Sequence, residues 1–446
     1  MSEFVVEGRH TLSGSVNVTG NKNEALPLVA AALLTDKPVT LHNIPDIEDV
    51  RTMLRIARHL GAHVSCEEGR TTITAERITT STIPLELSGR IRASILFASA
   101  LLARTGKAVI PQPGGDAIGR RRLDTHLLVL EALGARVKVA RTHPRGGSTR
   151  TVFTLSAPRG LRGAPILLDE ASVTATENAV IAAAAARGKS EIANAASEPH
   201  VQGLCRFLCK AGAHITGIGS NMLTVEGTDA PGGAEHVVSG DYIEAGSFIG
   251  LAAATGSEIE ITNIDPRTMR MILFQFSRVG VAVEPDPDRR RIKVPARGQL
   301  TMRTDLGGAI AAFEDSPWPG FPADLVSILL VVATQSNGTC LIHEKMFEAR
   351  LFFVDKLLAM GARIVLCDPH RAVVVGPSPL HASTLSSPDI RAGMALLIAS
   401  LAAEGESVIQ NIGQIDRGYE NIDGRLRALG ARITRRSNRG DCHDQC

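Results

Sequence analysis

Aromatic residues are scarce in this sequence, at 3% of 446 residues. The hydrophobic core must therefore be built from Ala, Val, Leu and Ile, and a hydrophobic content of 44% supplies enough of them for two or three domains. No apolar run reaches the roughly eighteen residues that cross a bilayer. The first residues lack the apolar segment and cleavage site of a secretory signal. We expect a cytoplasmic protein with no membrane partner.

Neither sign of charge is in excess, because the formal net charge is only +2 at pH 7. A chain so close to balance gives no reason to expect a nucleic-acid partner. Cysteines are few, and they follow no disulfide or zinc spacing. Cys205 and Cys209 lie one helical turn apart, with His200 and His214 nearby in sequence. Packing of a helix explains this set better than a metal does.

A short pattern recurs six times, at intervals of about 70 to 80 residues. In each copy a Gly-Ala or Gly-Val pair closes a predicted helix and opens a predicted strand, at Gly61, Gly134, Gly212, Gly280, Gly361 and Gly430. Glycine suits the left-handed residue that ends many helices. The interval is too long for a solenoid repeat and fits a small α/β module.

Each module also contains an Ala-rich helix that is apolar on almost every side, followed by a short β-branched strand. These helices are predicted at residues 24–35, 92–104, 175–187, 244–255, 324–334 and 391–404. Helices of this kind must be buried. Three of them inside three sheets would form one domain, so the sequence predicts an α/β (α+β) fold of six repeated units in two domains.

Polar residues stand at the N-terminal ends of these six helices: Lys22 and Asn23, Arg92, Ser172 and Thr174, Asp241 and Glu244, Asp324, and Asp389 and Arg391. Helix N-termini attract anions, and Ser, Asp and Asn are also ordinary caps there. Capping does not explain Lys22, Arg92 and Arg391, because a cation at this end opposes the helix dipole. If the six ends face one another across a cleft, these charges converge on a ligand site.

The stretch Pro113–His126 reads P-G-G-D-A-I-G-R-R-R-L-D-T-H. Its glycines allow sharp turns and close approach to a ligand. Asp116 lies among them, just before the three arginines at 120–122. A carboxyl group on a glycine-rich hinge beside dense positive charge indicates a proton donor next to an anion site. The alternative is a surface turn whose arginines are merely solvated.

Eight motifs resemble the enolpyruvyl transferase family, in family order and over nearly the whole chain. They are L-S-G-S-V-N-V-T-G-N-K-N-E-A-L-P from Leu12, I-R-A-S from Ile91, P-G-G-D-A-I-G from Pro113, A-S-E-P from Ala196, P-G-F-P-A-D from Pro319, F-E-A-R from Phe347, D-I-R-A-G from Asp389 and I-D-R-G-Y-E from Ile415. The resemblance is closest to the branch that acts on UDP-N-acetylglucosamine in the first committed step of peptidoglycan synthesis. The signatures that the EPSP synthase branch carries around its lysine are absent.

This resemblance implies a two-domain inside-out α/β barrel. One domain would span residues 21–240 and carry a mobile catalytic loop, and the other would combine residues 1–20 with 241–446. Substrate should close the domains, with the loop 114–122 as a lid. The family's reaction moves the enolpyruvyl group of phosphoenolpyruvate to the 3-hydroxyl of a UDP-sugar through a tetrahedral ketal and releases phosphate. It needs no cofactor and no metal. We expect a monomer or a weak homo-oligomer.

The resemblance also implies a role for each matching residue. Lys22, Arg121 and Arg391 would bind phosphoenolpyruvate with help from Arg92, Asp116 would be the general acid, and Asp324 would act as acid or base near the acceptor hydroxyl. Asn23 would contact substrate and intermediate, Asp124 the uracil, Ser172 and Val173 the phosphates, and Arg350 the same cleft. His126 matches no family role and is expected to pack within the fold.

Four departures from the family pattern leave the acceptor open. They are Glu24, Arg122, Glu170 and Thr174. The alternative acceptor is another uridine nucleotide, as in relatives from nucleoside antibiotic pathways. A different alternative is a catalytically silent paralogue that binds a UDP-sugar. The retained cations and acids argue against it, because a pure binder would not need groups for phosphoenolpyruvate.

Asp116 stands where most members of the family carry cysteine, and this predicts insensitivity to fosfomycin, an epoxide that alkylates the cysteine. The ordinary pKa of aspartate is about 3.9, against about 8.5 for cysteine. To donate a proton it must be raised by burial or protonated transiently, so the activity optimum should lie at lower pH than in the cysteine enzymes. The test is a series of fosfomycin concentrations. Covalent inactivation would contradict the prediction.

Overall fold

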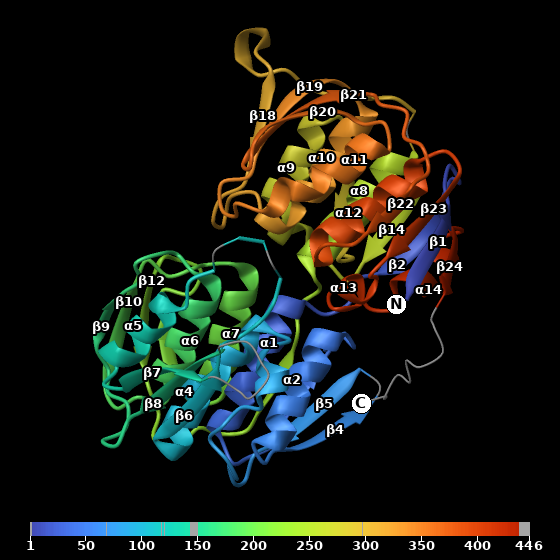
Figure 1. The fold of residues 1–446 in the computed structure, drawn as a ribbon. Helices are drawn as coiled ribbons and strands as arrows, with labels where there is room; N and C mark the ends of the chain where they lie inside the picture. Colours follow the sequence, from blue (N-terminus) through green and yellow to red (C-terminus); the bar gives the residue numbers. More distant parts are fainter. Residues whose placement is uncertain are drawn as a thin grey trace. The chain divides into compact units, whose positions relative to one another are not determined.

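The computed structural model describes residues 2–67, 69–116, 118–119, 121–142, 150–296 and 298–436. The chain forms two compact units, and each is described by itself (Figure 1). Unit 1 contains the chain up to Thr19, a short segment that begins at Asp116, and the chain from Gly240 onward. Unit 2 contains Gly20–Gly115 and Arg121–Ser239.

Three apolar helices form the centre of unit 2, where they contact one another. They are α1 (Lys22–Ala31), continued by η1 (Ala32–Leu34), α4 (Phe97–Thr105), preceded by η2 (Arg92–Leu96), and α6 (Val173–Ala184). Helices α2 (Glu48–His59), α5 (Asp124–Ala132) and α7 (Pro199–Lys210) each contact both a central helix and a sheet, and α3 (Leu85–Ser88) contacts η2.

The strands of unit 2 form three sheets. The first contains β13 (Ala234–Val237), β3 (Val39–His42), β5 (Arg70–Thr74) and β4 (His63–Glu67). The second contains β6 (Lys107–Pro111), β8 (Arg150–Ser156) and β7 (Arg136–Thr142). The third contains β11 (His214–Thr216), β12 (Met222–Glu226), β10 (Lys189–Ala193) and β9 (Pro165–Leu167).

Unit 1 repeats this plan around α8 (Tyr242–Thr255), α10 (Val326–Gln335), preceded by η5 (Ala323–Leu325), and α12 (Ile390–Ala402), which also contact one another. Its other helices are η3 (Pro266–Met269), α9 (Arg270–Arg278), η4 (Leu306–Gly308), η6 (Arg350–Phe353), α11 (Val354–Ala359), α13 (Gly413–Asp416) and α14 (Ile422–Ala428).

The strands of unit 1 also form three sheets. The first contains β15 (Glu284–Asp286), β16 (Arg291–Val294), β14 (Glu258–Thr262) and β2 (Ser13–Asn17). The second contains β17 (Leu300–Thr301), β18 (Ala311–Glu314), β19 (Ser336–His343), β21 (Arg371–Gly376) and β20 (Arg363–Asp368). The third contains β22 (Thr384–Ser386), β23 (Glu406–Gln410), β1 (Glu3–Glu7) and β24 (Arg432–Arg436).

All six sheets are small, mixed and built alike. In each, the strand that follows a central helix pairs antiparallel with one neighbour, as β3 does with β5 and β14 with β16. On its other side the same strand has a parallel partner, as β14 has β2. In the sheet of β6 this partner is reduced to one parallel bridge, Thr82 to Val109. The predicted repeat is therefore present as six mixed sheets around apolar helices.

The six predicted glycine turns all have left-handed backbone, with φ between 94° and 110°. In four of the six sheets, the strand that follows a central helix is itself followed directly by an asparagine with left-handed backbone. These residues, which were not predicted from the sequence, are Asn43, Asn194, Asn263 and Asn411. Each asparagine amide donates to the carbonyl of the residue just after the parallel partner strand, at 2.8–2.9 Å. Asparagine fits because it tolerates this backbone and supplies the donor.

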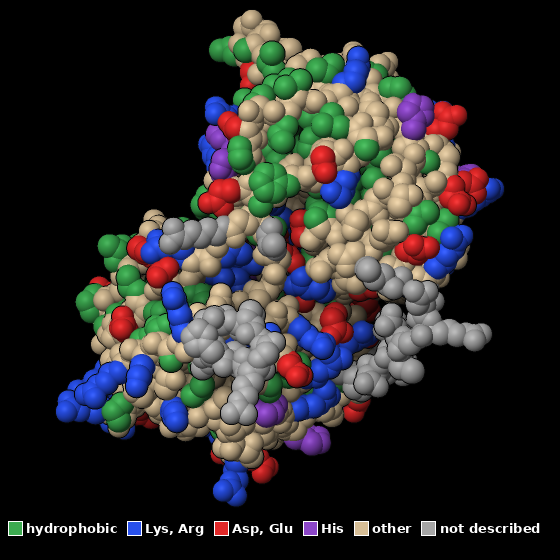
Figure 2. Space-filling view, in the orientation of Figure 1, with side chains coloured by type: hydrophobic (Ala, Val, Ile, Leu, Met, Phe, Trp, Pro, Cys, Tyr) green, Lys and Arg blue, Asp and Glu red, His purple; other side chains and the backbone are tan. Residues whose placement is uncertain are grey.

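The face shown in Figure 2 carries basic and acidic side chains, with apolar ones scattered among them, in keeping with the net charge of +2. Of the helices in the part of the chain that the structure describes, none has both the length and the apolar character to cross a membrane.

Replacing Asn263 with alanine should destabilise unit 1. The variant keeps a left-handed φ of 62° without its donor to Val18, at a cost of roughly 1–2 kcal/mol for the backbone and about 1 kcal/mol for the hydrogen bond. Thermal unfolding should show a midpoint several degrees lower. Asn263→Gly is the matched control: it relieves the backbone and should lose less. Equal midpoints for Asn263→Ala and the wild type would contradict this account.

Candidate active site

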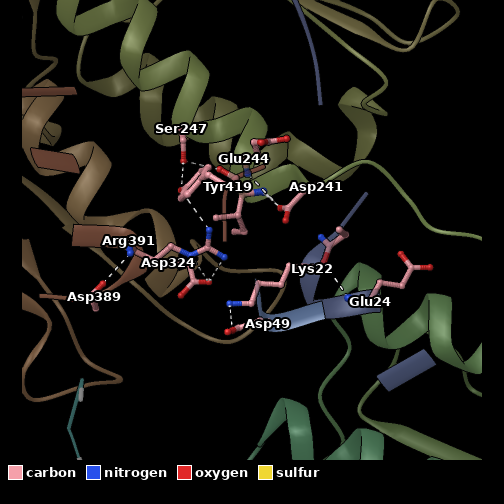
Figure 3. Close-up of polar contacts among 12 residues, drawn as sticks. Lys22, Glu24, Asp49, Asp241, Glu244, Ser247, Asp324, Asp389, Arg391 and Tyr419 are labelled. Atoms are coloured by element: carbon pink, nitrogen blue, oxygen red, sulfur yellow. Dashed lines mark hydrogen bonds and ion pairs between the residues drawn. The ribbon is translucent and has the colours of Figure 1, made fainter. Parts of the chain in front are cut away.

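Lys22 is the first residue of α1, and its ammonium group is buried against a carboxylate. The side chain is 9% exposed, and Nζ lies 2.7 Å from Oδ2 of Asp49, in the first turn of α2 (Figure 3). A buried cation is costly unless it is paired, so Asp49 is what allows a lysine at this helix end. Asn23, the next residue of α1, is half-buried.

Glu24 points away from Lys22 (Figure 3) and is fully buried inside unit 2. Its Oε1 lies 2.7 Å from Nε2 of His236, and its Oε2 accepts the Ser239 amide at 3.1 Å. Gly203 leaves room for it, because a Cβ there would lie 2.2 Å from the Glu24 carboxylate. This departure from the family pattern is therefore explained by packing within the unit.

Arg92 and Arg121 bring two guanidinium groups to the N-terminal end of the second central helix. Arg92 donates to the carbonyls of Arg121 and Arg122, which fastens the arginine turn to η2. Burial, and then repulsion by Arg121, lower the pKa of Arg92 to about 10, while Glu170 acts the other way. Arg120 lies outside the described residues.

The turn before these arginines needs glycine. Gly115 has a φ of 111°, and a Cβ there would lie 3.1 Å from Arg92 Cβ and 3.4 Å from an Arg121 guanidinium nitrogen. A side chain at this position would meet both a strained backbone and the cations.

Asp124, the residue expected to read uracil, is ion-paired with Arg122. Arg122 donates to Asp124 Oδ2 at 3.2 Å and to Asp169 Oδ2 at 2.8 Å, and Thr125 donates to Asp169 Oδ1 at 2.6 Å. The hydrogen bond from Thr125 is the largest influence that lowers the pKa of Asp169. Arg122, a second departure, thus links the start of α5 to the segment before α6.

Ser172 and Val173 begin the third central helix of the unit. Ser172 is the cap of α6, and its hydroxyl accepts the Ala175 amide at 3.3 Å. Thr174 follows, and its hydroxyl lies 3.1 Å from Nε2 of His126 on α5. Lys22 and Arg92 are thus the first residues of α1 and η2, and Ser172 caps α6, so all three lie at N-terminal ends of the central helices of unit 2.

In unit 1, Asp116 is ion-paired with Arg417. The Asp116 side chain is 16% exposed and that of Arg417 is 15% exposed, and Arg417 also donates to Gln414 at 2.9 Å. Two residues further on, the Ile118 carbonyl accepts the Ala349 amide at 3.2 Å. Ile118 thus contacts the F-E-A-R motif, which ends in Arg350.

Asp324 is held between two arginines. Arg391 places nitrogens 3.0 and 3.1 Å from Oδ2 (Figure 3). Arg350 contacts Oδ1. Arg391 also donates to the Tyr419 hydroxyl at 3.3 Å. Burial opposes the charge of Arg391, but Asp324, Tyr419 and Asp241 outweigh it and raise its pKa. Burial likewise opposes the charge of Arg350, and here Asp324 leads the carboxylates that raise the pKa.

Two further carboxyl groups cap the other central helices of unit 1. Asp241 accepts two amides at the start of α8, and Asp389 accepts the amides of Arg391 and Ala392 at 2.8 and 2.9 Å. Burial raises the pKa of both. The N-terminal ends in unit 1 therefore combine caps with an arginine-bound aspartate, whereas those in unit 2 present mainly cations.

Three residues with a place in these clusters were not assigned from sequence. Arg417 and Tyr419 lie in the quoted motif I-D-R-G-Y-E, so the signal was there but gave no role. Asp49 lies in no motif, and only the fold brings it to Lys22. Most of the other predicted site residues lie at or beside a central helix end. Arg121 lies in the turn whose carbonyl accepts from Arg92, Arg350 contacts Asp324, Asp124 pairs with Arg122, and Asp116 pairs with Arg417.

The Cys205 and Cys209 set offers little to a metal. Cys205 is buried, and burial raises the pKa of its thiol to about 12, far from the thiolate that metals bind. Within the described residues no three His, Cys, Asp or Glu side chains gather as a metal site requires.

Residues 6–426 match the family EPSP synthase (3-phosphoshikimate 1-carboxyvinyltransferase). Three curated relatives are named UDP-N-acetylglucosamine 1-carboxyvinyltransferase. That of Treponema denticola is 53% identical over 434 residues, covering 97% of this chain and 99% of the relative. That of Bradyrhizobium diazoefficiens is 51% identical, covering 97% and 98%. That of Bacteroides thetaiotaomicron is 49% identical, covering 98% and 100%.

Two solved structures share the fold. The enolpyruvyl transferase NikO from Streptomyces tendae has a TM-score of 0.84 at 24% identity, covering 98% of this chain and 99% of that one. EPSP synthase from Acinetobacter baumannii has a TM-score of 0.73 at 16% identity, covering 98% and 100%. At these identities the likeness shows a common mixed α/β fold, and it carries no argument about substrates.

A buried carboxyl pair supports the stretch before Arg350 and predicts a pH-dependent stability. Burial, together with Asp315, raises the pKa of Glu344 to about 9, while Asp315 accepts the amides of Lys345 and Met346. Because the folded carboxyl holds its proton and the unfolded one releases it near pH 4.5, this group's contribution is full below that pH. It is lost as pH rises toward 9.

Glu344→Gln cannot ionise, so its stability should fall less between pH 5 and 9 than that of the wild type. Urea midpoints at pH 5, 7 and 9 measure the difference, and the exposed Glu406→Gln is the control. If the gap between Glu344→Gln and the wild type stays constant over this range, Glu344 does not hold its proton in the folded protein.

Proposed function

This chain belongs to the enolpyruvyl transferase family of EPSP synthase and the UDP-N-acetylglucosamine 1-carboxyvinyltransferases, and we propose that it transfers the enolpyruvyl group of phosphoenolpyruvate to the 3-hydroxyl of UDP-N-acetylglucosamine, with release of phosphate. This would be the first committed step of peptidoglycan synthesis. The observation that carries the proposal is 49–53% identity to relatives of that name over at least 97% of the chain.

The site residues described above supply the charges and hydrogen-bonding groups that this reaction requires. Phosphoenolpyruvate has a phosphate and a carboxylate, and Lys22, Arg121 and Arg391, assisted by Arg92, supply cations for them. Asn23 contacts the substrate and the intermediate, and Arg350 holds Asp324 in place. At the acceptor, Asp124 reads the uracil, and the start of α6, at Ser172 and Val173, binds the phosphates.

The reaction has two steps. The acceptor oxygen bonds to C2 of phosphoenolpyruvate as its proton passes to Asp324, and C3 gains a proton from Asp116, which gives the tetrahedral ketal. The C2–O bond to phosphate then breaks as the leaving phosphate takes the proton from Asp324, and a proton passes from C3 back to the Asp116 carboxylate to restore the double bond. The ion pairs with Arg350 and Arg391 keep Asp324 ionised, the form that can accept a proton, and they orient its carboxylate. Asp116 acts as the general acid.

The pair Asp116–Arg417 fixes the position of this acid. Arg417 donates to Oδ1 of Asp116, and it has further N–H donors for the phosphate or carboxylate of phosphoenolpyruvate. The same arginine can therefore hold the acid and the substrate anion beside each other.

The four departures that left the acceptor open have partners inside unit 2. Glu24 is bound to His236, Arg122 to Asp124 and Asp169, and Thr174 to His126. The negative charge of Glu170 raises the pKa of Arg92, against the effects of burial and Arg121. None of these contacts calls for a different acceptor, and the relatives at half identity favour UDP-N-acetylglucosamine. A uridine nucleotide remains the alternative that the experiment tests.

The proposal includes the finer architecture that the family implies. The two units correspond to two domains, residues 21–240 and residues 1–20 with 241–446, of an inside-out α/β barrel with three repeats each. Six mixed sheets and two trios of apolar helices support this. The enzyme works without cofactor or metal in the cytoplasm, where both substrates occur, as a monomer or weak homo-oligomer.

Phosphate release from phosphoenolpyruvate, measured with UDP-N-acetylglucosamine, with UMP and without acceptor, tests the proposal. Release should require UDP-N-acetylglucosamine.

Asp116→Asn and Lys22→Gln should lose at least about a hundredfold in rate, since each removes a group used in the transition state. Asp116→Cys should stay active and become sensitive to fosfomycin. The exposed Lys37→Gln is the matched control. Phosphate release with UMP but not with UDP-N-acetylglucosamine would show that the acceptor is a uridine nucleotide. No phosphate release with any acceptor would refute enolpyruvyl transfer.

A further inference from the structure

A chain of hydrogen bonds inside unit 2 ends at one hydroxyl group on the first turn of α6. Ser99 on α4 donates to the Asn178 carbonyl at 2.8 Å and contacts its side-chain oxygen. The Asn178 amide nitrogen lies 3.2 Å from Nδ1 of His126, whose Nε2 lies 3.1 Å from the Thr174 hydroxyl. Ser99, Asn178 and His126 are at most 1% exposed, whereas Thr174 is half-buried.

This series of hydrogen bonds determines which atom donates and which accepts at His126 and Thr174. An amide nitrogen only donates, so Nδ1 of His126 accepts and the ring proton resides on Nε2. Nε2 therefore donates to Thr174, which keeps its own hydroxyl proton for another acceptor. Burial, with repulsion by Arg92 and Arg121, lowers the pKa of His126 to about 3, so the ring is neutral at physiological pH.

Thr174 does not use its proton as other helical threonines of this chain do. Thr105, Thr176 and Thr255 each donate to the carbonyl four residues earlier, at 2.8 Å. Among the described residues, Thr174 makes its side-chain hydrogen bond only with His126. Arg92 begins η2, which packs against α6, and repulsion by Arg92 and Arg121 contributes to the lowered pKa of His126.

We propose that Thr174 is a specificity-determining residue that donates its hydroxyl proton to a diphosphate oxygen of the UDP-sugar, and that His126 is the positioning residue that orients it. The inference rests on the proposed acceptor. In that molecule the diphosphate is the only anionic part, and it is the part suited to two arginines and a helix N-terminus. A hydroxyl donor there adds a directed contact that phosphoenolpyruvate does not share.

Calorimetric titration with UDP-N-acetylglucosamine, UDP and uridine tests the assignment on the full-length enzyme. Thr174→Val keeps the β-branched shape and removes the donor, so affinity for UDP and the UDP-sugar should fall about tenfold or more, while that for uridine stays unchanged. Thr174→Ser should remain within about threefold of the wild type. Thr268→Val, at the start of η3 in unit 1, is the matched control. Unchanged UDP affinity in Thr174→Val, or an equal loss for uridine, would overturn the proposal.

Two further measurements distinguish an orienting role of His126 toward the Thr174 hydroxyl from a role in packing alone. His126→Gln should weaken UDP binding in the wild-type background but add nothing to Thr174→Val, because the loss passes through the same hydroxyl. Additive losses would show that His126 acts independently. In the wild type, nitrogen NMR should find His126 neutral with its proton on Nε2 down to about pH 4. A proton on Nδ1 would overturn the orientation even if the histidine variant fails to fold.

The outcome for catalysis is distinguishable from the outcome for Thr174. If the wild type releases phosphate with UDP-N-acetylglucosamine and Thr174→Val binds UDP normally, the proposed function stands and the role of Thr174 falls. If UDP binding depends on Thr174 but no phosphate is released, the hydroxyl contact stands and enolpyruvyl transfer falls. If the wild type binds no uridine nucleotide, both fall.

Discussion

The central helices of this protein are apolar on every side, and this constraint determines where its chemistry can be. A helix surrounded by other helices and sheets tolerates few charged groups along its length, and the cations and carboxylates that the chemistry needs lie near its ends. Those ends are held rigidly by the packing of the same helices. Lys22, Arg92 and Ser172 lie at the N-terminal ends of the three central helices of one unit, and Asp241, Asp324 and Asp389 lie at the N-terminal ends in the other.

Charges at such ends need partners, and the protein supplies them from its own side chains. Lys22 has Asp49, Asp116 has Arg417, and Asp324 has two arginines. Breaking a buried pair outright costs about 3–5 kcal/mol because a charge is stranded. These ion pairs therefore satisfy buried charges at the helix ends with the protein's own side chains.

The sequence was informative where local pattern decides structure. Apolar runs indicated the six central helices. Glycine in the Gly-Ala and Gly-Val pairs indicated the six turns that follow the other helix of each repeated unit. Motifs identified Asp116 and Arg391 without showing what they touch. The sequence could not show that Glu24 pairs with His236, or that Asp49 pairs with Lys22, because such contacts join residues that only the fold brings together. The left-handed Asn263 was missed for the same reason: its acceptor, the Val18 carbonyl, lies just after β2, far away in the chain.

One feature of the sheets bears on the order of folding. Strand β1 lies between β23 and β24, so Glu3 pairs with both Gln410 and Arg436. All strands of unit 2, in contrast, lie between residues 39 and 237. As the chain is synthesised, unit 2 can complete its three sheets while β1 and β2 wait unpaired. Unit 1 is thus the late-closing half, and its completion requires loop closure over almost the entire chain.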